Sequence, residues 1–343
     1  MNITYLIGNG FDLNLGLKTG YSDFLEKYKE IKPTDSEIIK KFKQDILKDE
    51  DLWSRAEEQF GKYTQEFDGN KFTVDQYCEC HEDFCANLAE YLKSEEKKIK
   101  FASISEDVLE RCFKSLNNYT DGFGSLITKE LPEPTTAGNN YCFINFNYTQ
   151  TLDNLLMYLE RNPFVHFEYS PCIKNIHVHG LCDGTMVLGV NDKTQISNIQ
   201  LFDGQPTEYL SQIMKPMTYE ITEVDNDDKV IEIIRNSDLI YIYGMSLGLT
   251  DLRWWEEIIA TMLSKPSVRT IIHVYDSIGL GFFKTKQKIM EKKVFSNFFA
   301  LFDNVLDDIN IEYLKKRIYI TSYNIFNDIK DLANYNNSNE EAV

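Results

Sequence analysis

Six short runs of apolar residues recur along the chain, and each is apolar nearly throughout instead of alternating with polar positions. Such runs, rich in β-branched and aromatic side chains, are typical of strands buried on both faces of a parallel sheet. Three of them are followed by segments with helical spacing, at 151–160, 252–263 and 325–335. The predicted strands cover residues 3–7, 141–146, 175–179, 239–244, 269–275 and 317–323. Strand followed by helix predicts an α/β fold with a doubly wound, mostly parallel sheet of Rossmann type.

A long, almost purely helical pattern separates the first two predicted strands. Its apolar residues keep helical spacing, as in Trp53, Ala56, Phe60, Tyr63 and Phe67. A crossover of this length predicts an inserted helical subdomain. We place the insertion at 20–135, the α/β nucleotide-binding core at 1–19 and 136–333, and a flexible polar tail at 334–343.

Composition narrows the function classes. Of 343 residues, 36 are Lys or Arg and 54 are Asp or Glu, a formal charge of −18 that argues against binding nucleic acid through its phosphates. No segment reaches about 18 uninterrupted apolar residues, so no membrane partner is expected. Seven cysteines without disulfide-scaffold spacing fit reduced thiols. We expect a soluble, cytoplasmic protein.

The first predicted strand runs into the sequence Gly8-Asn9-Gly10. Glycines at this place let the backbone approach a pyrophosphate, to which exposed N–H groups donate. Leu13 stands where the third glycine of a dinucleotide fingerprint would be, so a plain turn is the alternative. Asp12 is placed to meet a ribose hydroxyl, or else to cap a local turn.

Polar side chains end the second predicted strand. Asn145 and Asn147 lie where the carboxyl edge of the sheet should open, which is the ligand crevice of open α/β sheets. An amide can position a water or a sugar hydroxyl. The alternative is that Asn147 or Thr149 caps the following helix.

The third predicted strand ends in His177-Val-His179-Gly180. Alternation places both histidines on the same side of the strand. A neutral imidazole is the usual proton acceptor near neutral pH. Zinc would need about four ligands, and the cysteines nearby give no recognised spacing. The cluster at 78–85 follows a helical stripe that predicts packing, with Cys80 pointing away. No metal is expected.

The fourth predicted strand leads into Gly244-Met-Ser246-Leu-Gly248, which matches the nucleophile elbow of serine hydrolases. The only later histidine, His273, lies in a strand with its nearest following acid, Asp276, in the wrong order for a triad. A second backbone loop over a nucleotide is the better interpretation, with Thr250 or Asp251 capping the next helix. Asn191 and Asp192 fall in a polar loop that could form a lid.

Taken in order, GNGFDL, FNYTQTLDNL, HVHG, LGVND and YGMSLGLTD resemble the AbiH family of bacteriophage abortive-infection proteins over nearly the whole chain. That family in turn is similar to sirtuin-like NAD-binding domains. The resemblance implies Asn147 and His179 as catalytic residues, with His179 the general base and His177 a supporting residue. It implies NAD binding by Gly8, Asn9, Gly10, Asp12, Asn145, Thr149, Gly180, Gly244, Ser246 and Asp251.

Two departures from the sirtuin pattern matter. Thr149 stands where the related pattern has Asp, and the zinc ribbon of the deacylases is missing, which disfavours protein deacylation. The function implied is an antiphage effector that hydrolyses NAD to nicotinamide and ADP-ribose. One alternative is a non-catalytic nucleotide sensor that signals through the helical insertion. The other is a serine hydrolase that uses Ser246. A nucleotide ligand, a phage-derived trigger and a second copy of the chain are the expected partners.

Overall fold

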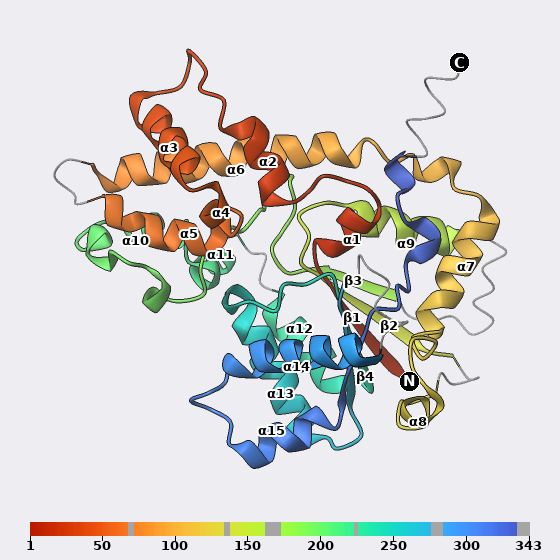
Figure 1. Ribbon diagram of the computed structural model, residues 1–343. Helices are drawn as coiled ribbons and strands as arrows, with labels where there is room; N and C mark the ends of the chain where they lie inside the picture. Colours follow the sequence, from red (N-terminus) through yellow and green to blue (C-terminus); the bar gives the residue numbers. More distant parts are fainter. Residues whose placement is uncertain (68–71, 134–137, 162–172, 223–225, 276–283, 335–343) are drawn as a thin grey trace.

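The computed structural model describes residues 1–67, 72–133, 138–161, 173–222, 226–275 and 284–334. Over these residues a single six-stranded sheet has the order β3-β2-β1-β4-β5-β6, and every neighbouring pair is parallel (Figure 1). The strands are β1 (Asn2–Ile7), β2 (Asn140–Asn145), β3 (Ile173–His177), β4 (Leu239–Tyr243), β5 (Arg269–His273) and β6 (Ile318–Thr321). The predicted α/β fold with a parallel sheet is confirmed.

Helices cover both faces of this sheet, which explains why its strands are apolar on both sides. On one face, Tyr5 and Ile7 pack with α7 (Glu106–Asn117) and α9 (Thr151–Arg161). On the other, Leu6 packs in a core formed with α12 (Asp227–Asn236), α13 (Leu252–Ser264), α14 (Lys284–Ala300) and α15 (Asp308–Lys315). The helices predicted at 151–160 and 252–263 are therefore present.

The strand order reverses between β1 and β4, because the chain leaves β1 towards β2 and later returns to β4 on the other side. Ile7 pairs with Asn145 on one side and with Tyr243 on the other, so the carboxyl ends of these strands lie level. In open α/β sheets this reversal point opens the ligand crevice. It brings together the loops that begin at Gly8 and Gly244.

Helices fill the segment between β1 and β2, and they belong to two cores. Those from α2 to α6 pack together above the sheet (Figure 1) and share their core with residues from 182 to 214. They are α2 (Tyr21–Tyr28), α3 (Glu37–Lys48), α4 (Glu50–Trp53), α5 (Ala56–Tyr63) and α6 (Val74–Glu96). Residues 99–131, with α7 and α8 (Ser125–Thr128), contribute to the core against the sheet instead. The domain boundaries at 20–135 stay a prediction.

Several local expectations were wrong. Of the helix predicted at 325–335, the described residues are α-helical only at 332–334. The segment before them contains a 3₁₀ turn, η7 (Asn327–Ile329), and Asp331 N–H donates to Asn14 O at the end of α1 (Gly10–Asn14). Cys80 does not point away from the core but is buried in it. The third strand ends at His177, two residues early, and β5 and β6 also end two residues before their predicted bounds. Most of the predicted tail lies outside the described residues.

Candidate functional site

Backbone packs directly against backbone where the loops after β1 and β4 meet. The N–H groups of Gly8 and Gly10 donate to the carbonyl oxygens of Tyr243 and Gly244, both at 2.9 Å. A Cβ on Gly10 would lie 2.3 Å from Gly244 Cα, and Gly244 itself has a φ of +68°. These two N–H groups are therefore not exposed for a phosphate, contrary to the sequence expectation. That other groups of these loops bind a pyrophosphate stays a prediction.

Gly10→Ala should destabilise the protein by about 2 kcal/mol, because the added methyl group overlaps backbone that no side-chain rotation can clear. Urea unfolding measures the change in the free energy of unfolding, provided that the m value is the same for the variant and the parent. Gly124→Ala is the matched control, since nothing lies within 4 Å of the place that its methyl group would take and its φ is −74°. A loss for Gly10→Ala no larger than for Gly124→Ala would contradict the packing account.

Asp12 lies buried beside this loop, on α1. Its carboxylate accepts hydrogen bonds from Thr149 Oγ1, at 2.6 Å, and from Thr151 Oγ1. Asn9 Oδ1 accepts from Thr19 Oγ1, also at 2.6 Å. Burial raises the pKa of Asp12 to about 6, although the two threonine hydroxyls lower it. Thr149 therefore orients an acid on the neighbouring helix α1, and the alternative that it caps the following helix stays a prediction.

The raised pKa of Asp12 makes its contribution to stability depend on pH. Its ordinary pKa is 3.8, so between about pH 4 and pH 6 the folded state keeps a proton that the unfolded state has released. The contribution is present below this window and is lost as pH rises through it. The free energy of unfolding of the parent minus that of Asp12→Asn should fall by up to about 3 kcal/mol from pH 4 to pH 7. Urea titrations across this range measure it, and a constant difference would contradict it.

The side chain of Asn147 is buried, and neither its amide nitrogen nor its amide oxygen has a hydrogen-bond partner. Its backbone is fixed, since its N–H donates to Asn145 Oδ1 at 3.0 Å and its carbonyl oxygen accepts from His177 Nδ1 at 3.0 Å. The helix-capping alternative for Asn147 is therefore wrong. The amide lines a cavity of about 80 Å³ that Asn9, Asp12 and Tyr148 also line. An unsatisfied buried amide costs about 1–3 kcal/mol.

His177 supports the loop that carries Asn147. The Asn147 carbonyl oxygen only accepts, so Nδ1 of His177 carries a hydrogen, while Nε2 lies 2.9 Å from Asp153 Oδ2. The Asn145 amide nitrogen lies 3.5 Å from the same Nε2. Asn145 and His177 thus hold the strand ends and the Asn147 backbone together.

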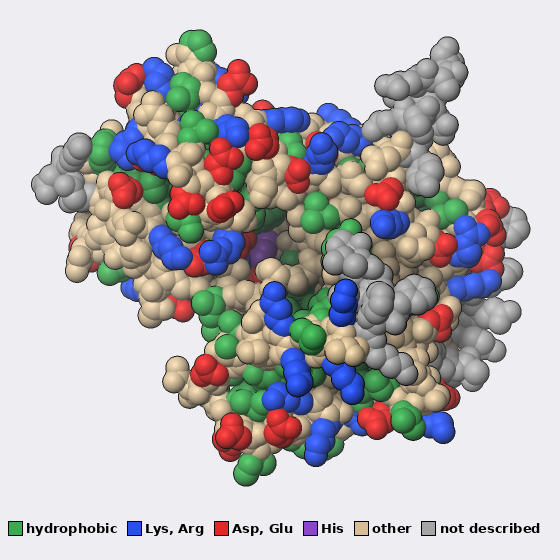
Figure 2. Space-filling view, viewed as in Figure 1, with side chains coloured by type: hydrophobic (Ala, Val, Ile, Leu, Met, Phe, Trp, Pro, Cys, Tyr) green, Lys and Arg blue, Asp and Glu red, His purple; other side chains and the backbone are tan. Residues whose placement is uncertain are grey.

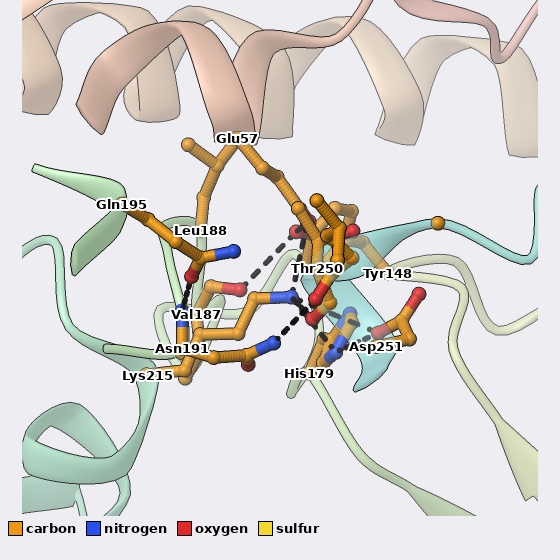
Figure 3. Close-up of polar contacts among 12 residues, drawn as sticks. Glu57, Tyr148, His179, Val187, Leu188, Asn191, Gln195, Lys215, Thr250 and Asp251 are labelled. Carbon is orange, nitrogen blue, oxygen red and sulfur yellow. Dashed lines mark hydrogen bonds and ion pairs between the residues drawn. The ribbon is translucent and has the colours of Figure 1, made fainter. Parts of the chain in front are cut away.

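His179 contacts a different set of groups. Its Nε2 lies 3.2 Å from Lys215 Nζ and 3.3 Å from Asp251 Oδ1 (Figure 3), and its ring packs against Phe146 and Tyr148. The two histidines share none of these partners, although alternation along one strand was expected to place them on the same side. The reason is that β3 has already ended and Gly180, with a φ of +70°, turns the chain. A Cβ there would lie 1.9 Å from Thr185 O.

Lys215 and Glu57 complete this cluster, and sequence reasoning missed both. Lys215, at the start of α11 (Lys215–Thr222), is 2% exposed and donates to Glu57 Oε2 at 2.9 Å. Glu57 lies on α5, and its Oε1 is 3.1 Å from the Tyr148 hydroxyl. Burial would raise the pKa of the Asp251 carboxyl, but the effects that lower it, the largest from the Lys215 ammonium, outweigh burial. Asp251 is thus ionised. It occupies the N-cap position of α13, as predicted, but its side chain makes no capping hydrogen bond there.

The predicted catalytic pair faces two different cavities. His179 and Lys215 line a second cavity of about 230 Å³ with Asn191, Arg253 and Trp254. The side chains of Phe146 and Tyr148 line the Asn147 cavity and also contact the His179 ring. Figure 2 shows a hollow between the helices above and the sheet layer below, with a histidine visible inside it.

The loop predicted as a lid borders this second cavity. Asn191 Nδ2 donates to Leu249 O at 2.9 Å, which ties the loop to the segment after β4. Asp192 accepts from the Thr194 N–H at 2.6 Å and begins a 3₁₀ turn, η3 (Lys193–Gln195). The loop therefore covers the cavity edge in this structure.

Ser246 lacks the surroundings of a catalytic nucleophile. Its side chain is exposed, and among the described residues the strained position after β4 is Leu247, with a φ of +54°, not the serine. His273, the histidine that a hydrolase would need, stacks on Tyr243 with ring centres 4.4 Å apart, and burial lowers its pKa to about 4. These contacts give His273 a packing role.

Fold and site together define a class: a Rossmann-type α/β protein with a buried cluster of charged residues and a histidine beyond the carboxyl edge of its sheet, to which α5 contributes Glu57. Residues 4–275 match the family model described as bacteriophage abortive infection AbiH, and the chain belongs to this family. Membership indicates a function in phage abortive infection. A search of curated proteins found no match. Within the described residues, no helix is both long and apolar enough to cross a bilayer.

Proposed function

We propose that this protein acts in abortive infection by binding NAD at the carboxyl edge of the sheet and hydrolysing its nicotinamide–ribose bond. The observation that carries the proposal is the buried Asn147 amide, which lines a cavity beside the strand-order reversal with both polar atoms unpartnered. A ligand that offers hydroxyl or amide groups would satisfy it. The nicotinamide riboside half of NAD offers both.

The cluster around His179 suits the charge changes of this reaction. Water adds to the ribose carbon as nicotinamide leaves, and the products are nicotinamide, ADP-ribose and a proton. The transition state carries positive charge on the ribose, as in other glycosidic cleavages. Glu57, Asp251 and Lys215 sum to one negative charge with His179 neutral, which stabilises such a cation. His179 would accept the proton released by water, and Asn147 would position the water or a ribose hydroxyl.

In this proposal the two cavities act as parts of one site. Phe146 and Tyr148 separate Asn147 from His179, so binding requires these side chains to shift. Tyr148 is held by Glu57 and by Val187 O, at 3.1 and 3.2 Å, and exchanging these contacts would open a passage. The ligand-bound site would then bring water within reach of both groups.

A nucleotide sensor without turnover is the second candidate function. The observation that favours it is the Lys215 ammonium, which lies against Nε2 of His179, the atom that a general base would use. A protein kept in this state would bind the nucleotide and signal through α5, which carries Glu57.

Incubation of the purified protein with NAD, with nicotinamide and ADP-ribose quantified by chromatography, tests the proposal, and calorimetry measures binding in parallel. We expect both products in equal amounts. Binding without products, with and without lysate from phage-infected cells, would favour the sensor. Ester hydrolysis lost in Ser246→Ala would instead favour a serine hydrolase.

A further inference from the structure

Lys215 is an almost fully enclosed charge beside His179. All three of its ammonium hydrogens have an acceptor: Glu57 Oε2 at 2.9 Å, Thr250 O at 3.2 Å and His179 Nε2 at 3.2 Å (Figure 3). The side chain is 2% exposed, so water does not compete for these hydrogens. Its position is thus defined by three protein groups at once.

This geometry determines which form of His179 fits. An ammonium group has only donors, so the contact with Lys215 requires a lone pair on Nε2. Asp251 Oδ1 lies 3.3 Å from the same atom but forms no hydrogen bond, so it does not hold a hydrogen there. The other titratable neighbours are Glu57, which reaches His179 through Lys215, and Tyr148, whose pKa burial raises well above its ordinary value. The neutral imidazole with its hydrogen on Nδ1 satisfies these contacts.

We propose that Lys215 is a positioning residue that keeps His179 neutral, with its Nε2 lone pair directed at the ammonium, and that Glu57 holds Lys215 in place. This is the form that a general base needs, and a water or substrate hydroxyl would replace the ammonium when ligand binds. The catalytic consequence rests on the proposed function, whereas the state of the imidazole does not.

The arrangement links the imidazole to the helical insertion. Glu57 lies on α5, and the segment leading to Lys215 is bonded to the same helices: Ser197 N–H donates to Gly61 O at 3.0 Å, and His81 Nε2 lies 2.9 Å from Leu188 O. Lys215 N–H in turn donates to Val190 O at 2.9 Å. Movement of the helices α2–α6 relative to the sheet would therefore carry Lys215 away from His179.

The test is nitrogen-15 NMR of the full chain with labelled histidine, in which the His179 signals are those lost in His179→Gln. At pH 7 we expect a lone pair on Nε2 and a hydrogen on Nδ1 in the parent. In Lys215→Met, Asp251 becomes the nearest charge, and the midpoint of the imidazole titration should rise by at least about one pH unit. Glu57→Gln should change it in the same direction, and Lys215→Arg should retain the parental form.

Lys43→Met is the matched control, because Lys43 is also 2% exposed and paired, with Asp35 at 2.8 Å, but it contacts α2 and not His179. It should leave the His179 titration unchanged. A hydrogen on Nε2 in the parent, or an unchanged midpoint in Lys215→Met, would overturn the proposal, and the parental measurement decides even if that variant does not fold. Absence of NAD hydrolysis with the expected NMR result would refute the enzyme function alone.

Discussion

His179→Ala is expected to slow nicotinamide release from NAD at least about 100-fold, the lower range for losing a general base. The Nε2 lone pair of the imidazole faces Lys215 Nζ, and in the proposed reaction a water or hydroxyl would replace this ammonium. Glu57 and Asp251 are both engaged with Lys215, so neither readily takes over the proton. Initial rates under saturating NAD measure the effect, with KM determined separately.

His273→Phe is the control for removing a buried histidine. His273 stacks on Tyr243 and has a pKa near 4, so it is neutral at pH 7 and an aromatic ring replaces it well. Its rate should stay within about threefold of the parent. Equal losses in both variants would show that His179 serves folding and not the reaction.

Asn147→Leu is expected to weaken NAD binding at least about 100-fold while leaving the fold as stable as the parent or more stable by about 1 kcal/mol. The amide contributes no hydrogen bond to the described structure, so the fold loses nothing when it is replaced. Its cavity of about 80 Å³ also leaves room for the leucine methyl groups. Thermal unfolding and calorimetric titration of the same samples measure the two effects.

A substitution that weakens NAD binding without lowering the free energy of unfolding identifies a residue that faces the ligand, whereas replacing a structural residue lowers the free energy of unfolding. The matched control is Asn145→Leu, since Asn145 is equally buried but its Oδ1 accepts from the Asn147 N–H. That variant should lose about 1–3 kcal/mol of unfolding free energy, because it leaves a buried donor without a partner. Loss of stability in both variants would remove the argument for an open ligand site at Asn147.

The sheet and its carboxyl edge could be predicted from sequence because each strand is a short apolar run with its own local signal. Asn147 and His179 follow two of these strands directly, so their place near the edge was accessible from the same pattern. Their separation into two cavities was not, because it depends on where β3 ends and on the turn at Gly180. Because β3 ends two residues earlier than predicted, the His179 imidazole meets other groups than alternation along the strand would give it.

Lys215 and Glu57 could not be found by spacing. Lys215 lies 36 residues from His179 and 158 residues from Glu57 along the chain, and neither stands in a recognisable motif. The contact between Lys215 and Glu57 depends on the packing of the helices α2–α6 against residues 182–214. The glycines of the first loop were found for a partly wrong reason, since Gly10 is required by contact with Gly244.

The most direct measurement is calorimetric titration of NAD into the parent and into Asn147→Leu. The account predicts saturable one-to-one binding to the parent and none, over the same concentration range, to a variant that unfolds at the same or a higher temperature. Equal binding by the two proteins would contradict the assignment of the Asn147 amide as the group that faces the ligand. So would an Asn147→Leu protein that is markedly less stable than the parent.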